Sequence, residues 1–415
     1  MITIPPALRH RNFALLWSGS FISNAGSQMQ FWALLWHLST LTDDPIVVSG
    51  VGLVRFVPIL LFSLFGGLAA DSFNRRVIML ITQTTMMLAA LMLGLLTLAG
   101  QIQIWHVYLL TGIQALASAF DGPARQSLVP NLIPREVYTN AFSLQSIAMN
   151  TGSILGPALN GLVISTLGLE WVYLINAASF LTVIGALVLI GNVPQSAAIS
   201  NGQRRGVNLA AIREGIAFIL HQPVILASMV LDFWATFFSS ANTLLPFVAR
   251  NVLNVSVVEY GWLSSGQAIG AVTVGLLFSQ RSHIRRQGQL LLAAVAAFGM
   301  ATILFGLSRV FAITLFALIF IGASDSVSTI LRNTIRQIQT PDALRGRMVS
   351  INQIFFMGGP QLGEIEAGLV AQFFGVPAAI LSGGVGCLLA AVLVAARWPQ
   401  LLRYRGDEEL VIRAG

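Results

Sequence analysis

Long apolar runs recur along this chain from Phe13 to Ala396, and they constrain its fold more than any other feature. The chain has 415 residues, of which 55% are hydrophobic and only 9% are charged. In soluble globular proteins about a quarter of the residues are charged. About 20 mostly apolar residues cross the hydrocarbon core of a bilayer, where every backbone N–H and C=O must be bonded within its own segment. The sequence therefore predicts an all-α protein that crosses a membrane many times.

Proline, glycine and arginine residues divide the apolar runs into twelve predicted membrane-spanning helices. Their predicted ranges are 12–38, 46–70, 77–99, 104–128, 138–166, 171–191, 223–249, 258–280, 288–307, 310–334, 345–373 and 377–396. The one long polar connection separates six helices from six. We expect an N-terminal six-helix bundle at 1–191, a cytoplasmic linker at 192–222, a C-terminal six-helix bundle at 223–396 and a cytoplasmic tail at 397–415. Residues 208–221 fit either an amphipathic helix on the membrane surface or an ordinary linker helix.

Two stretches, residues 121–161 and 325–368, align at a constant offset of 207 residues, for example from Arg125 to Arg332. The same offset aligns Pro134 with Pro341 and a series of glycines, which pairs Gly152 with Gly359, Gly156 with Gly363 and Gly161 with Gly368. Shared apolar composition would rarely place an arginine, a proline and spaced glycines in one register. The sequence therefore predicts an internal duplication.

The formal net charge of +7 comes from arginine, because the sequence contains no lysine. In the twelve-helix arrangement nearly all of the loop arginines fall on one side of the membrane, and Arg250 and Arg309 fall on the other. Arginine and lysine are enriched in cytoplasmic loops, so we expect both termini to be cytoplasmic. The basic charge then indicates orientation, and we do not expect binding to nucleic acid.

Missing residue types also exclude several classes of function. Without lysine there is no Gly-Lys-Ser or Gly-Lys-Thr phosphate loop, so we expect no nucleotide cofactor. Any transport would then be powered by a gradient, for which we expect protons, or by a partner. Cys387 is the only cysteine, and no cysteine and histidine cluster predicts a metal site. No nucleophile and base constellation indicates an enzyme. We expect a monomer in the lipid bilayer that binds a small-molecule substrate.

Polar residues inside the predicted helices are candidates for a transport pathway, since polar groups that face lipid are costly. Asn24 and Gln28 lie on one face of the first helix, where they fit either helix-to-helix hydrogen bonds or the lining of a substrate cavity. Arg55 lies well inside the second helix. In the fourth helix Asp121 and Arg125 either line the pathway or pair with each other across one turn.

Three acids in the second half of the chain are candidates for proton coupling, and a fourth acid, on the tenth helix, is a candidate for the lining of the pathway. Asp232 is isolated among apolar residues of the seventh helix, where desolvation disfavours its charged form. Arg55 is a possible partner for Asp232, and a purely structural hydrogen bond is the alternative. Glu364 and Glu366 lie in the eleventh helix, and because they are two residues apart at most one faces a cavity. Asp325 lies on the tenth helix, on one face with Arg332.

The segment between the second and third helices carries the first family pattern. Gly67, Asp71, Arg75 and Arg76 resemble the signature loop of the major facilitator superfamily. Ser72 stands where a basic residue is usual, and Asn74 stands where glycine is usual, an exchange that a left-handed turn tolerates. The resemblance implies a cytoplasmic gate, in which Asp71 pairs with arginines or with a helix terminus when the two halves close.

A second pattern lies in the fifth predicted helix. Gly152, Gly156, Pro157 and Gly161 resemble the helix 5 antiporter motif of superfamily exporters, with Asn160 where a second glycine is usual. Small residues allow close helix contact, and the proline permits a bend. The stretch from Gly122 to Pro130 is similar to the bacterial branch that contains siderophore exporters and macrolide or multidrug efflux proteins.

The resemblance implies two six-helix bundles that rock around a central site to give alternating access. It implies export of amphipathic organic compounds, either drugs or siderophore-like metabolites, through the bacterial inner membrane in exchange for protons. Asp232, Glu364 or Glu366 would carry the proton. The alternatives are an importer or flippase of a lipid or nutrient on the same fold, and a transport-inactive membrane scaffold or sensor.

Overall fold

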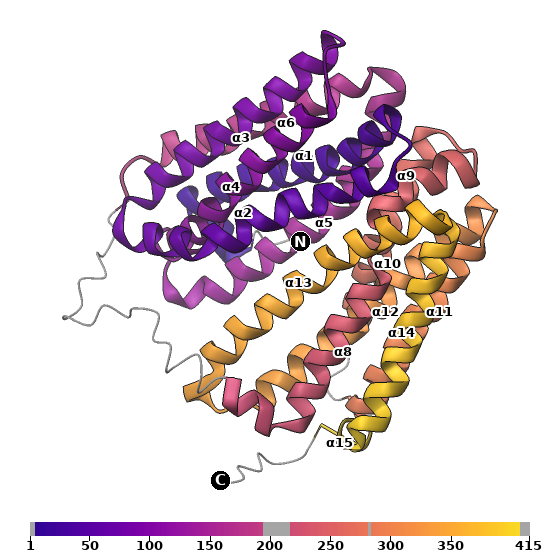
Figure 1. Ribbon diagram of the computed structural model, residues 1–415. Coiled ribbons are helices and arrows are strands. Elements are labelled where there is room, and N and C mark those ends of the chain that lie inside the picture. Colours follow the sequence, from indigo (N-terminus) through magenta and orange to yellow (C-terminus); the bar gives the residue numbers. More distant parts are fainter. Residues whose placement is uncertain (1–4, 194–215, 281–283, 407–415) are drawn as a thin grey trace. The chain divides into compact units, whose positions relative to one another are not determined.

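A computed structural model of the chain describes residues 5–193, 216–280 and 284–406. All regular elements within these residues are helical, which confirms the predicted all-α class (Figure 1). The predicted linker helix at 208–221 lies mostly outside the described residues, which resume at residue 216. The tail beyond residue 406 lies outside them as well.

The chain divides into two compact units. Unit 1 comprises Met1–Asp43, Val51–Gln203 and Val255–Ser265. Unit 2 comprises Asp44–Gly50, Arg204–Asn254 and Gly266–Gly415. The long helices in the first half of the chain are α1 (Arg11–Leu41), α2 (Pro45–Ser72), α3 (Arg75–Leu98), α4 (Ile104–Leu128), α5 (Tyr138–Thr166) and α6 (Leu169–Ile190). Those in the second half are α8 (Pro223–Ser239), α10 (Val257–Ser279), α11 (Gln287–Leu307), α12 (Phe311–Ile338), α13 (Asp342–Phe374) and α14 (Val376–Arg397), followed by the short α15 (Pro399–Arg403).

Nine helices of the described residues are long and apolar enough to cross a membrane. Three further long helices, α1, α4 and α13, have 31, 25 and 33 residues. At about 1.5 Å per residue they also have the length needed to cross a hydrocarbon core of about 30 Å. These helices carry the polar residues that the sequence singles out, which lower their hydropathy. Twelve spans are therefore consistent with the structure.

The seventh predicted span differs from a single helix over 223–249. The helix α8 ends at Ser239, and it is followed by η4 (Asn242–Leu244), α9 (Leu245–Phe247) and a π-helical turn, η5 (Val248–Val252). Pro246 explains part of the break, because its ring removes a backbone donor and clashes with the carbonyl four residues earlier. The Ser240 hydroxyl donates to the Thr236 carbonyl oxygen at 2.5 Å, a back-bond of the type that bends helices.

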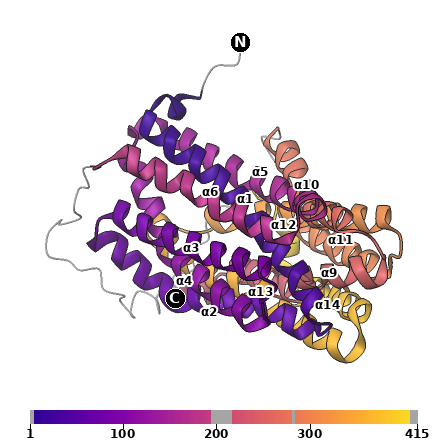
Figure 2. The ribbon, with the colours of Figure 1, turned by 90° about the horizontal axis from the view of Figure 1, so that it is seen from above.

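In unit 1, α1 packs against both α5 and α6, and α3 packs against α4 and α6 (Figures 1 and 2). The contact between α5 and α1 depends on small residues. A Cβ atom added at Gly156 would lie 2.8 Å from the Ala25 carbonyl oxygen, and one added at Gly152 would clash with the Asn24 amide. Without side chains at these two positions, the helix backbones approach closely.

The equivalent glycines make the equivalent contact in unit 2, where α13 packs against α8. A Cβ atom added at Gly359 would clash with the Thr236 hydroxyl, and one added at Gly363 would clash with the Phe237 carbonyl oxygen. The glycines that align in the sequence therefore hold the fifth long helix of each half against the first. The two aligned stretches, residues 121–161 and 325–368, therefore contribute to the same kind of close helix contact in each half.

Asn74 starts α3 as a capping residue. Its side-chain oxygen accepts hydrogen bonds from the backbone N–H groups of Arg76 at 3.0 Å and Val77 at 3.4 Å. Its φ angle is −64°, so the left-handed turn that the sequence suggested is not used. Asparagine fits this position because its side chain satisfies donors that the first helical turn leaves unpaired.

Substitution of Gly363 tests the role of the close contact. We expect Gly363→Ala to lower the melting temperature of the purified protein, because α13 must move away from the α8 backbone, and overpacking of this kind costs about 1–3 kcal/mol. Gly358→Ala is the matched control in the same helix, since a Cβ atom there meets nothing within 4 Å. Equal melting temperatures for the two variants would contradict the argument.

Candidate functional site

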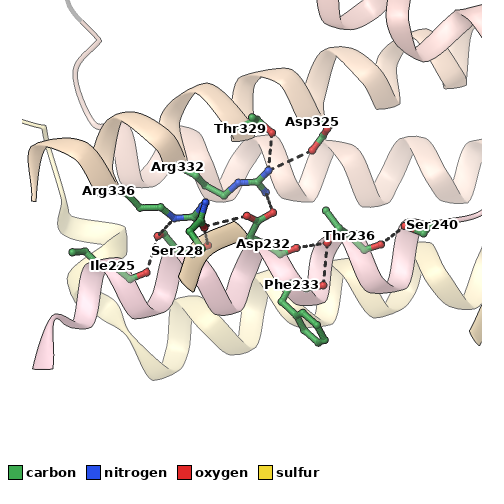
Figure 3. A network of polar contacts seen from close by, with 11 residues as sticks. Ile225, Ser228, Asp232, Phe233, Thr236, Ser240, Asp325, Thr329, Arg332 and Arg336 are labelled. Carbon is green, nitrogen blue, oxygen red and sulfur yellow. Dashed lines mark hydrogen bonds and ion pairs between the residues drawn. The ribbon is translucent and has the colours of Figure 1, made fainter. Parts of the chain in front are cut away.

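A buried charge cluster in unit 2 joins α8 to α12 (Figure 3). Asp232 lies on α8, and its two carboxylate oxygens face two arginines of α12. Arg332 Nη1 lies 3.0 Å from Asp232 Oδ1, and Arg336 Nη2 lies 3.1 Å from Asp232 Oδ2. The three side chains are only 1–2% exposed. One carboxylate thus holds two guanidinium groups in the interior of the unit.

The spacing of residues along the two helices explains this arrangement. Arg332 and Arg336 are four residues apart on α12, and Ser228 and Asp232 are four apart on α8, so each pair lies on one helix face. Arg336 donates from Nε to Ser228 Oγ at 3.1 Å and from Nη2 to the Ser228 carbonyl oxygen at 3.0 Å. It also donates to Asn352 Oδ1 on α13. Arg336 therefore connects three helices.

Asp325 adds a second acid to the cluster, at a longer distance. Its Oδ1 atom lies 3.6 Å from Arg332 Nη2, and its side chain is 45% exposed. The same nitrogen donates to Thr329 Oγ1 at 2.7 Å, so Arg332 has partners on both sides (Figure 3). With one fully buried acid, one partly exposed acid and two arginines, the cluster can balance its charge only while both acids are ionised.

The expectation that Asp232 is isolated is wrong. Its partners are Arg332 and Arg336 of unit 2, whereas Arg55, the partner suggested from the sequence, belongs to unit 1. Sequence reasoning missed Arg336 entirely as a site residue. A signal was present, because Arg336 follows the duplicated Arg332 by four residues and so shares its helix face. The role of Asp232 in proton coupling stays a prediction.

Glu364 and Glu366 lie on α13. Glu364 is buried, with 7% of its surface exposed, whereas Glu366 is partly exposed. This difference follows from their spacing, because residues two apart in a helix point to different faces. Their proposed roles stay predictions.

Asp121 and Arg125 pair across one turn of α4, in agreement with the local alternative. Arg125 Nη2 lies 2.7 Å from Asp121 Oδ2. The other oxygen, Asp121 Oδ1, accepts from Thr82 Oγ1 at 3.0 Å and from Gln83 Nε2 at 2.9 Å. Arg125 also donates to Ser20 Oγ of α1. The carboxylate is therefore fully occupied by donors, and the pair is neutral.

A cavity of about 370 Å³ lies beside this ion pair within unit 1, and Trp17, Asn24, Asp121 and Arg125 are among its lining residues. Asn24 combines both sequence alternatives, because it lines this cavity and also donates to the Ala148 carbonyl oxygen of α5 at 3.3 Å. Gln28 serves helix packing, since its Nε2 donates to Ser153 Oγ of α5 at 3.0 Å.

Arg55 lines a second cavity of about 190 Å³ in unit 1. Its guanidinium carbon lies 4.3 Å from the centroid of the Phe31 ring, which is the geometry of a cation–π contact. Arg55, which the sequence places inside a predicted span, therefore lies in the wall of a cavity.

The arginines of the predicted gate hold the loop to unit 1. Arg75 donates from Nη1 to the Ser127 carbonyl oxygen at 3.0 Å, near the end of α4. Arg76 donates from Nε to the Leu187 carbonyl oxygen of α6 at 2.6 Å. Because carbonyl groups in the last turn of a helix lack intrahelical donors, both arginines act at helix ends. Asp71 is exposed near the end of α2, and its role in a gate stays a prediction.

The remaining residues of the two family patterns differ in how closely their surroundings pack. A Cβ atom at Gly67 of α2 would meet nothing within 4 Å. In α5, Gly152, Gly156, Pro157 and Gly161 are buried. The helix continues through Pro157, so the proline lies inside α5 and does not end it.

Comparison with known proteins gives a family and a fold. Residues 3–404 match the family described as transmembrane secretion effectors. The enterobactin exporter EntS of Shigella boydii serotype 18 is 28% identical over 345 residues, which cover 82% of this chain and 80% of the exporter. The protein of the same name from Escherichia coli O81 has the same identity and coverage. These relatives are exporters, which confirms the expectation that the chain is a transporter and not an enzyme.

Two solved structures illustrate the shared fold. A bacterial homologue of the human lysosomal transporter Spinster, in an inward-facing and unoccupied conformation, has a TM-score of 0.70 and 16% identity, and the match covers 97% of this chain and 98% of that one. The nucleoside transporter NupG has a TM-score of 0.71 and 15% identity, with 95% and 99% coverage. The predicted major facilitator fold is confirmed.

Removal of the shared carboxylate tests the energetics of the cluster. We expect Asp232→Ala to destabilise the protein strongly, because loss of one partner of a buried ion pair costs about 3–5 kcal/mol. Asp325→Ala should cost less, since the exposed part of its side chain is solvated. Melting temperatures of the purified variants measure the difference. A larger decrease in melting temperature for Asp325→Ala than for Asp232→Ala would show that Asp232 is not the main stabilising acid of the cluster.

Proposed function

The chain belongs to the transmembrane secretion effector family, and on this premise we propose that it exports amphipathic organic compounds in exchange for protons. The compounds are drugs or siderophore-like metabolites, and the membrane is the bacterial inner membrane. The siderophore class is supported by the relatives, which are named as enterobactin exporters. The observation that carries the coupling is the single carboxylate of Asp232 between two buried arginines.

A proton on Asp232 would change the contact between two helices. The ionised carboxylate attracts both guanidinium groups, which bind α12 to α8. In the interior these attractions are strong because the local dielectric constant is low. Protonation removes the negative charge, and it leaves two like charges beside each other. The protonated and ionised forms of Asp232 therefore favour different helix arrangements, which is the requirement for linking a proton to a conformational change.

The substrate pathway in this proposal follows the polar residues of α1 and α4 in unit 1. Two cavities lie along these helices, and they share Ser27, Met86, Ser118 and Phe180 in their walls. Aromatic and amide side chains together suit a compound with both apolar and polar parts. Alternating access would come from rocking of the two six-helix bundles, with Asp71 acting at the cytoplasmic side and both termini in the cytoplasm.

Protein in proteoliposomes tests the coupling. We expect an imposed pH gradient to drive substrate accumulation by the wild type, and we expect Asp232→Asn to lose this response while it retains exchange of labelled for unlabelled substrate. The reason is that exchange needs no net proton movement. Asp325→Asn, Glu364→Gln and Glu366→Gln are the parallel variants. Substrate accumulation by the wild type that does not respond to the imposed pH gradient would rule out proton coupling.

Cells that lack the gene test the direction of transport. We expect the deletion to increase sensitivity to exported drugs or metabolites, and we expect the wild-type gene, but not Asp232→Asn, to restore resistance. In wild-type cells an uncoupler should raise the accumulation of the substrate, because export loses its energy source. Lower accumulation with the uncoupler would indicate an importer. An unchanged phenotype after joint neutralisation of Asp232, Glu364 and Glu366 would indicate a scaffold or sensor.

A further inference from the structure

The larger cavity of unit 1, of about 370 Å³, is bordered by a buried polar atom that the proposed proton coupling does not use. The wall is formed by α1, α3, α4, α5 and α6, and it includes Gln83 of α3. Gln83 is only 1% exposed. Its side-chain oxygen Oε1 is buried and has no hydrogen-bond partner among the described residues. A buried acceptor without a donor is costly, because it has lost its contact with water.

The orientation of the Gln83 amide is fixed by Asp121 of α4. Gln83 Nε2 donates to Asp121 Oδ1 at 2.9 Å. An ionised carboxylate only accepts hydrogen bonds, so the amide cannot turn around and present its oxygen to Asp121. The atom that is left without a partner is therefore the acceptor Oε1. Only an O–H or N–H donor can satisfy it.

The charge of the cavity wall favours a neutral donor over a charged one. Asp121 and Arg125 are the only charged side chains among the described residues that line the cavity. They neutralise each other, because Arg125 Nη2 lies 2.7 Å from Asp121 Oδ2. The other oxygen, Asp121 Oδ1, accepts from Thr82 and Gln83. A ligand ion would lose its hydration beside a wall with no net charge to compensate it. A neutral donor leaves the ion pair intact.

The apolar part of the wall suits an aromatic ring. Phe13, Trp17, Met86 and Phe180 line the cavity. The Trp17 ring is held in place, since its Nε1 donates to the Leu144 carbonyl oxygen at 2.9 Å. Aromatic rings pair with one another in offset-stacked or edge-to-face arrangements, and a methionine sulfur also makes favourable contacts with a ring. The cavity therefore combines aromatic and sulfur contacts with one neutral acceptor.

The size of the cavity limits what can enter it. Sites for drug-sized ligands usually enclose about 300–1,000 Å³. At about 370 Å³ the cavity lies at the lower end of this range, so it suits a small ring system or one end of a larger compound. The adjoining cavity of about 190 Å³ shares Ser27, Met86, Ser118 and Phe180 with it and can hold a further part of a larger compound.

We infer that Gln83 selects compounds whose aromatic end carries a neutral hydrogen-bond donor. This inference rests on the proposed export function, and it narrows the amphipathic substrates to that class. The donor binds Gln83 Oε1, the ring packs against Trp17 and Met86, and the Asp121–Arg125 pair stays closed. Side-chain rotamers commonly change on binding, and such a change opens Oε1 to the donor. Compounds of the same shape without the donor leave Oε1 unpaired, and they bind more weakly.

Indole and N-methylindole test this selection in a binding experiment with the full-length protein in lipid nanodiscs. The indole N–H is a donor only, and methylation removes it while the ring stays the same. We expect the wild type to bind indole about tenfold more tightly than N-methylindole, the ratio that 1.4 kcal/mol represents. Nanodiscs without protein measure the partition of each probe into lipid, and this background is subtracted.

Two neighbouring residues of α3 provide a variant and its matched control. Gln83→Met keeps the length of the side chain and removes the acceptor, so it should abolish the preference for indole. Thr82→Val removes the other donor to Asp121 Oδ1 and leaves Gln83 Oε1 in place, so it should keep the preference. If Gln83 served only to support Asp121, both variants would change the preference alike, and that result would overturn the inference.

Equal binding of the two probes by the wild type, or an unchanged preference in Gln83→Met, would also overturn it. Tighter binding of tryptamine, which is indole with a cationic side chain, than of indole would show that the cavity selects a cation and would overturn the neutral class. If Gln83→Met does not fold, Gln83→Asn decides the question, because its shorter side chain withdraws the acceptor and should lower the preference for indole.

The result is separate from the proposed function. A preference for indole that depends on Gln83, without proton-driven transport, would overturn the export mechanism alone. Proton-driven transport by a protein that binds indole and N-methylindole equally would overturn the role of Gln83 alone.

Discussion

The burial of two guanidinium groups around one carboxylate is the physical constraint on which unit 2 depends. Moving an ion out of water costs several kcal/mol even after the protein has relaxed, and in this unit three ions are almost completely buried. The cost is offset because Asp232 faces both arginines and because Arg336 also finds acceptors on Ser228 and Asn352. Helices α8 and α12 are thus held together by groups that would be strongly unfavourable apart.

The two arginines that align in the sequence, Arg125 and Arg332, make different contacts in the two halves of the chain. In the first copy Arg125 pairs with Asp121 of its own helix, so the pair survives any movement of that helix. At the offset of 207 residues, Asp121 corresponds to Ser328, and the buried acid that Arg332 contacts at 3.0 Å lies on α8, while Asp325 of its own helix lies farther away at 3.6 Å. An ion pair between two helices depends on their separation. The closest acid to the aligned arginine therefore lies on its own helix in one half and on another helix in the other half.

The sequence was sufficient to predict features that depend on neighbouring residues of one helix or on the apolar environment of the membrane. Helix positions follow from apolar length and from proline and glycine, and the Asp121–Arg125 pair follows from a spacing of four residues. The partners of Asp232 required knowledge of which faces of α8 and α12 meet, and composition does not contain it. The carbonyl contacts of Arg75 and Arg76 were missed for a related reason, since backbone acceptors at helix ends leave no trace in residue types.

The break after Ser239 affects how motion passes along the seventh span. A continuous helix behaves as a stiff rod, and a twist at one end is carried to the other. Here the helical backbone hydrogen bonds are interrupted between α8 and α9, so the interruption is a possible hinge within the span. Asp232 and Ser228 both lie in α8, before this interruption. No continuous helix therefore joins Asp232 to the π-helical turn, and a rotation of α8 has no unbroken hydrogen-bonded ladder through which to reach it.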